Sequence, residues 1–63
     1  MIPIPEVYRT EYREAARTLR RCNEYIQASI LTEASTKTEL PPGLYLDAIR
    51  AYHLYLQLSQ IPR

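Results

Sequence analysis

The sequence is poor in the residues that usually stabilise so short a chain. Its 63 residues include one cysteine, one histidine and one glycine, with no phenylalanine and no tryptophan. One cysteine cannot form a disulfide within the chain, and one histidine beside it is too few for a structural zinc site. Chains of this length usually need a disulfide, a metal or a partner. We therefore predict no metal and no other cofactor, and we expect association with another protein chain.

An excess of charge of one sign and the motifs of common catalytic sites are also lacking. Eight Lys and Arg residues oppose seven Asp and Glu residues, for a net charge of +1, so no overall field points to a nucleic acid or an anionic membrane. The sequence contains no glycine-rich phosphate loop, no nucleophile with a neighbouring acid and base, and no cluster of metal ligands. We predict that the protein is not an enzyme and has no small-molecule substrate.

Targeting signals and long hydrophobic runs are missing as well. Residues 1–6 have neither the basic region nor the apolar stretch of a secretory signal. The most apolar stretch, residues 40–58, is interrupted by charged and polar side chains, so we expect no membrane span. We expect an intracellular, cytoplasmic protein, and the unpaired Cys22 fits a reducing compartment.

Prolines divide the chain. Pro3 and Pro5 favour an extended arm over residues 1–5, and the next prolines are Pro41 and Pro42. In between, residues 6–34 contain neither proline nor glycine, and their apolar residues recur at spacings of four and three. At 100° per residue these fall in an arc about 80° wide. They are Tyr8, Tyr12, Ala15, Leu19, Cys22, Ile26 and Ile30. We predict one long helix over residues 6–34 that buries this stripe.

The remaining chain predicts a loop, a second helix and a tail. Hydroxyl residues and the two prolines favour a loop over residues 35–41. Pro42 suits the first position of a helix over residues 42–60, and Pro62 ends it before a tail at residues 61–63. Two helices joined by a short loop should pack antiparallel. We predict a single all-α domain, a two-helix hairpin.

The second predicted helix has more apolar surface than the first helix can cover. One seam consists of Leu44, Ala48, Ala51, Tyr55 and Leu58, and a second seam beside it consists of Tyr45, Ile49, Tyr52 and Leu56. Together with Leu54 they span roughly 220°, about twice the stripe of a one-sided surface helix. Soluble monomers avoid exposed patches of that size. We predict that the first seam faces the first helix and the second seam binds a partner, although the two seams could be exchanged.

Three arrangements would cover the second seam. We expect the first of these, a homodimer that forms a four-helix bundle, since two-fold self-association is the commonest oligomer. A larger hetero-complex would use the chain as a small subunit. Alternatively, Ile2 and Ile4 of the N-terminal arm would fold over the seam. In the first two cases the chain is a protein–protein interaction module: an adaptor, a regulator or an assembly subunit.

Arginines gather on the other side of the first predicted helix. They fall in an arc of about 120° opposite the apolar stripe, and they are Arg9, Arg13, Arg17, Arg20 and Arg21. This arginine face suits phosphate or carboxylate groups, and it makes a nucleic-acid-binding regulator the alternative function. It also suits an acidic protein surface, or a solvated helix face with internal ion pairs such as Arg20–Glu24.

The aromatic residues are six tyrosines. Tyr8 and Tyr12 lie near the start of the first predicted helix, and Tyr52 and Tyr55 lie near the end of the second. An antiparallel hairpin would bring these four rings together. Tyrosine combines a large contact area with a hydroxyl that tolerates water, a profile favoured at interfaces.

Overall fold

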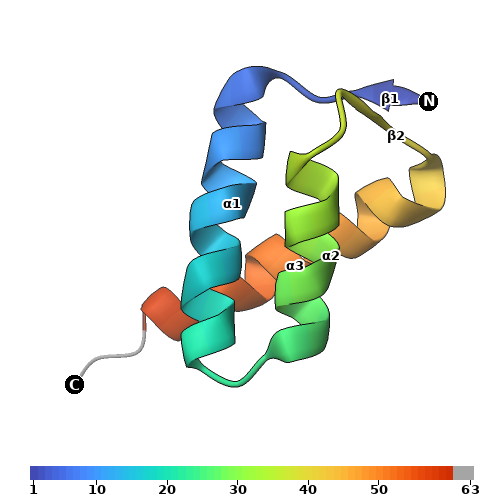
Figure 1. Cartoon of the computed structure of the whole chain (residues 1–63). Helices are drawn as coiled ribbons and strands as arrows, with labels where there is room; N and C mark the ends of the chain where they lie inside the picture. The colour runs from blue at the N-terminus through green and yellow to red at the C-terminus, as the bar shows by residue number, and fades with distance from the viewer. Residues whose placement is uncertain (61–63) are drawn as a thin grey trace.

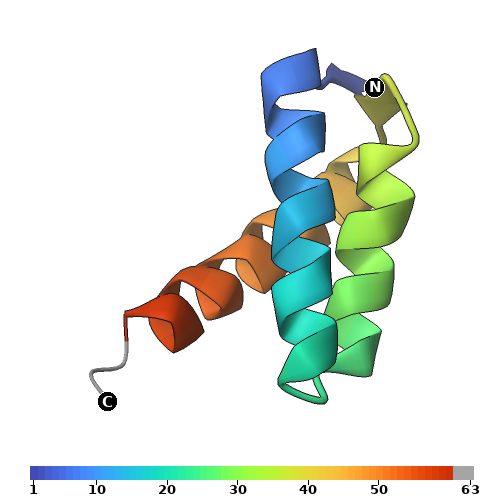
Figure 2. The same ribbon diagram turned by 60° about the vertical axis from the view of Figure 1, so that its left-hand side comes forward.

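The computed structural model describes residues 1–60, which form three helices and one short strand pair (Figure 1). In chain order they are β1 (Ile2–Pro3), α1 (Glu6–Arg21), α2 (Tyr25–Ser35), β2 (Glu39–Leu40) and α3 (Pro42–Ser59). Helices α1 and α2 lie side by side and antiparallel, and α3 crosses one face of this pair (Figures 1 and 2). The prediction of a mostly helical chain is confirmed, but the two-helix hairpin is wrong. The predicted tail, 61–63, lies outside the described residues.

The predicted long helix is broken at Asn23. This residue has a φ of 65°, in the left-handed region that asparagine tolerates better than other side-chain-bearing residues. The Glu24 N–H donates to the Leu19 carbonyl at 2.9 Å, and the Asn23 N–H donates to the Arg20 carbonyl at 3.1 Å. These two bonds satisfy carbonyls that the end of a helix leaves free, an arrangement known as a Schellman motif. The chain therefore reverses, and α1 and α2 form the antiparallel pair.

The reversal changes which residues are buried. Tyr12, Ala15 and Leu19 are buried in α1 as predicted. The predicted stripe is wrong at Cys22, which ends α1 and is exposed, and at Ile26, which is 77% exposed because α2 starts a new rotational phase. Ile30 packs partly buried against the core, as the stripe predicted. The buried residues of α2 are Ala28, Leu31, Ala34 and Ser35. The helix therefore includes Ser35, which the prediction placed in the loop.

The N-terminal arm joins the fold through the strand pair. Ile2 pairs with Leu40 in an antiparallel register, and the Ile4 N–H donates to the Thr38 carbonyl at 2.8 Å. Ile4 is 5% exposed and Leu40 is fully buried. The arm is therefore extended, as predicted, and it supplies part of the core. The alternative in which Ile2 and Ile4 of the arm cover the second seam is matched only at Tyr45, which shares a hollow with Pro3, Ile4 and Pro5. The arm itself pairs with Glu39 and Leu40, which precede α3.

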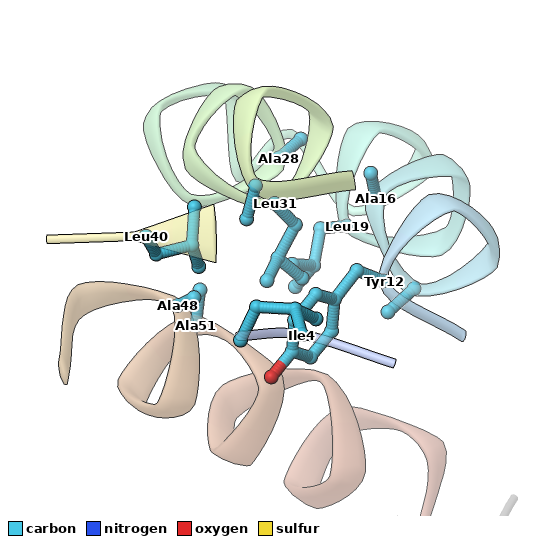
Figure 3. Packing of buried hydrophobic residues seen from close by; sticks show 11 residues of the cluster. Ile4, Tyr12, Ala16, Leu19, Ala28, Leu31, Leu40, Ala48 and Ala51 are labelled. Carbon is cyan, nitrogen blue, oxygen red and sulfur yellow. The ribbon is translucent and has the colours of Figure 1, made fainter. Parts of the chain in front are cut away.

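The core is small and rich in alanine (Figure 3). Its alanines come from all three helices and allow their backbones to approach closely. The largest fully buried side chains are Leu19, Leu31 and Leu40. Helix α3 begins at Pro42, as predicted, and its buried residues are Ala48 and Ala51. It rests on the α1–α2 pair through small residues, so its larger apolar side chains lie at the margins of the contact.

Candidate interaction surfaces

The first seam of α3 faces the core. Its central residues, Ala48 and Ala51, are fully buried, and Leu44, Tyr55 and Leu58 pack partly buried against the core cluster. This is the orientation that the sequence suggested for this seam. The contact runs to both α1 and α2, because α3 crosses the pair rather than lying along one helix.

The structure divides the predicted partner-binding seam. Tyr45 and Tyr52 pack against the core cluster, on the side of α3 where Tyr52 meets α1. Ile49 and Leu56 are half-buried and are not among the side chains packed against that cluster. The four predicted residues therefore lie at the edge of the fold, two facing inward and two facing outward.

Sequence reasoning missed Leu46, which is 54% exposed. Leu46, Ile49, His53 and Leu56 follow one another at spacings of three, four and three, the pattern of a coiled-coil stripe. At 100° per residue they occupy an arc about 80° wide and point about 150° away from the midpoint of Ala48 and Ala51. We call these four residues the outer seam. The spacing of these four residues is present in the sequence, but the prediction placed Ile49 and Leu56 in the neighbouring apolar seam and left Leu46 out.

Tyr52 is the centre of an aromatic cluster between α1 and α3. Its ring lies edge-on to Tyr12 at 5.7 Å between centroids and is tilted against Tyr55 at 5.4 Å. The Tyr52 hydroxyl donates a hydrogen bond of 2.7 Å to Glu11 Oε2, which with burial raises the pKa of Tyr52 to about 12. Three of the four tyrosines expected to cluster form these ring pairs; Tyr8 is 53% exposed and lies beside Tyr12 in the lining of a hollow instead. Glu11 is a partner that only the crossing of α3 reveals.

A hollow of about 190 Å³ lies where the arm passes α1 and α3. It is lined by Pro3, Ile4, Pro5, Tyr8, Tyr12 and Tyr45, and we call it the tyrosine hollow. Burial raises the pKa of Tyr12, and the neighbouring Tyr45, Tyr8 and Glu11 raise it further by their negative charge when ionised. Sequence reasoning placed Tyr8 and Tyr12 in a core stripe and Tyr45 in a partner seam, so it missed this meeting point.

All five residues of the arginine face lie on α1. Four of them are exposed, and Arg9 is half-buried. Its Nε atom is buried without a hydrogen-bond partner among the described residues. The expected Arg20–Glu24 pairing on one helix face is wrong, because α1 ends at Arg21 and Glu24 lies beyond the left-handed residue. Arg20 and Arg21 instead lie in the last turn of α1, where positive charge is favourable to the helix dipole.

A shallow surface depression of about 380 Å³ covers the outer side of α2. Its lining is Tyr25, Ile26, Ser29, Ile30 and Glu33. The Tyr25 hydroxyl donates to Asn23 Oδ1 at 3.0 Å, so this exposed ring leans back on the turn between α1 and α2. All of the lining comes from one helix, and no second element closes the depression.

Within residues 1–60, no three His, Cys, Asp or Glu side chains are placed to bind a metal ion together. None of the helices in this range is both long and apolar enough to cross a membrane. In comparisons with known proteins, no family model, curated protein or solved structure matches the chain.

Proposed function

We propose that this chain is a small non-enzymatic protein–protein interaction module that binds through the outer seam of α3. The observation that supports this is the exposure of Leu46 beside the half-buried Ile49 and Leu56, on the side of α3 turned from the core. Covering a large apolar side chain contributes about 1.5–3 kcal/mol. A core this small supplies a total stability of at most about 5 kcal/mol. Contact through this seam would therefore change the stability of the whole chain.

A second copy of the chain is the partner that fits the seam best. The spacings three, four and three read the same in both directions, so two antiparallel α3 helices related by a two-fold axis would match. Leu46 of one protomer would face the partner's Leu56, and Ile49 would face the partner's His53. Arg50 lies beside the seam near this axis, so the two guanidinium groups would repel each other. Added salt should therefore tighten the dimer.

The test is the solution mass of the chain by sedimentation equilibrium over a range of concentrations. We expect a reversible dimer and its loss in Ile49→Asp, because the substitution places an unpaired charge in the contact. Ile26→Asp is the matched control, since Ile26 is an exposed isoleucine on α2, and it should keep the wild-type association. A wild-type chain that stays monomeric, or an Ile49→Asp variant with unchanged mass, would contradict self-association through this seam.

The alternative, a nucleic-acid-binding regulator acting through the arginine face, is favoured by one observation. Because α1 ends at Arg21, Glu24 does not follow Arg20 by one helical turn, so Glu6 is the carboxylate that α1 keeps in the middle of the arginine arc. The same salt series separates the two functions. Binding to phosphates weakens as salt is added, whereas the dimer proposed here strengthens.

A further inference from the structure

The tyrosine hollow brings together aromatic side chains from two helices. Tyr8 and Tyr12 come from α1 and Tyr45 from α3, while Pro3, Ile4 and Pro5 of the arm complete the lining. Figure 3 shows Ile4 beside Tyr12 at this place. The arm is fixed here by the Ile4 N–H, which bonds to the Thr38 carbonyl at 2.8 Å. The lining is therefore held by main-chain pairing as well as by packing.

The electrostatics of the hollow favour a cation. The faces of tyrosine rings carry partial negative charge and attract cations that lie over them. Glu11 is next to Tyr12 in the sequence and accepts the Tyr52 hydrogen bond, so its carboxylate lies beside the tyrosine cluster but outside the lining of the hollow. Arg9 lies about 100° from Tyr8 around α1 but about 60° from Tyr12, and it is half-buried, so its positive charge opposes part of this attraction.

The apolar part of the lining restricts the kind of cation. Polar and apolar atoms share the lining. Its proline and isoleucine side chains offer no hydrogen-bond acceptor to an N–H group, but they make good contacts with methyl groups. The volume of about 190 Å³ is below the roughly 300 Å³ at which pockets for drug-sized ligands begin, so a small head group fits and a large ligand does not. A cation surrounded by methyl groups meets both conditions.

We propose that the tyrosine hollow binds a quaternary ammonium group through cation–π contacts with Tyr8, Tyr12 and Tyr45. This chemistry is shared by choline and by the side chain of trimethyllysine. The tyrosine hollow and the outer seam of α3 have no residue in common, so this proposal does not depend on the proposed self-association.

Titration of the full chain with choline, followed by NMR, tests the proposal. We expect saturable shifts of the Tyr8 and Tyr45 signals. The neutral isostere, in which carbon replaces the quaternary nitrogen, should bind about tenfold more weakly, because it keeps the shape and loses the charge. A peptide with trimethyllysine and the same peptide with unmodified lysine form the second arm. Tighter binding of the methylated peptide than of choline identifies a protein ligand, and the reverse identifies a small molecule.

Variants at Tyr8 separate ring chemistry from simple packing. Tyr8 is half-exposed, so Tyr8→Leu should fold, and we expect it to weaken choline binding about tenfold while Tyr8→Phe retains it. Tyr25→Leu is the matched control, an exposed tyrosine on α2 outside the hollow. Equal binding of choline and its neutral isostere, unchanged binding in Tyr8→Leu, or the absence of saturable shifts would each overturn the proposal.

Discussion

Tyr52 connects two helices that are distant in the sequence. Its hydroxyl donates to Glu11 on α1 at 2.7 Å, and its ring contacts both Tyr12 and Tyr55. A hydrogen bond to a carboxylate favours the neutral phenol, because ionisation would place two negative charges side by side. The pKa of Tyr52 rises to about 12 for this reason, ahead of burial.

The raised pKa makes a prediction about alkaline pH. A proton bound more tightly in the folded state stabilises folding below the ordinary tyrosine pKa of about 10 and loses this effect between about pH 10 and 12. We expect wild-type protein to lose more stability between about pH 8 and about pH 11 than Tyr52→Phe, measured by urea unfolding. Tyr25→Phe controls for the removal of an exposed tyrosine hydroxyl. If Tyr52→Phe and Tyr25→Phe show the same pH dependence, the bond to Glu11 does not form in solution.

The turn between α1 and α2 decides the arrangement of the elements. Arg20 and Arg21 in the last turn, followed by Asn23 in the left-handed region, form a regular helix end. This signal was readable from the sequence, since asparagine after basic residues is a recognised stop. The apolar spacing that continued through Cys22 and Ile26 hid it. The spacing of apolar residues along the sequence does not reveal a helix break when apolar residues continue at spacings of three and four across it.

Substitution of Asn23 tests whether the helix is broken. Alanine is strained at a positive φ, so Asn23→Ala should destabilise the protein by about 1 kcal/mol. A continuous helix over residues 6–34 would instead be stabilised, because alanine is the best helix former. Asn23→Gly keeps the left-handed region accessible and should stay within about 0.5 kcal/mol of wild type. Urea unfolding of the three proteins separates these outcomes, and a stabilised Asn23→Ala would show that the turn is wrong.

The N-terminal arm completes the core of the whole molecule. The α1–α2 pair and α3 share a core of mostly small side chains, and Ile4 and Leu40 contribute two of its larger members from outside the helices. For a chain of this length the loss of one such residue removes a large part of the total stability. The arm is therefore part of the folded unit.

A matched pair of isoleucines tests this packing. Ile4→Ala should cost about 2–5 kcal/mol, because Ile4 is 5% exposed and its removal leaves a cavity. Ile26→Ala should change stability by less than about 0.5 kcal/mol, because Ile26 is 77% exposed. Thermal and urea unfolding measure both. A large loss in Ile26→Ala with little loss in Ile4→Ala would restore the single long helix predicted from the sequence.

The sequence by itself determined the features that depend on neighbouring residues. Proline geometry set the extended arm and the start of α3 at Pro42, and apolar spacing identified Tyr12, Ala15 and Leu19 as buried residues of α1 and the core-facing seam of α3. Tertiary structure decided the rest. The rotation of α2 about its axis, the Tyr52–Glu11 bond and the tyrosine hollow all depend on a chain reversal and on the angle at which α3 crosses. Spacing along one helix contains no information about that angle, because it arises only when several elements pack together.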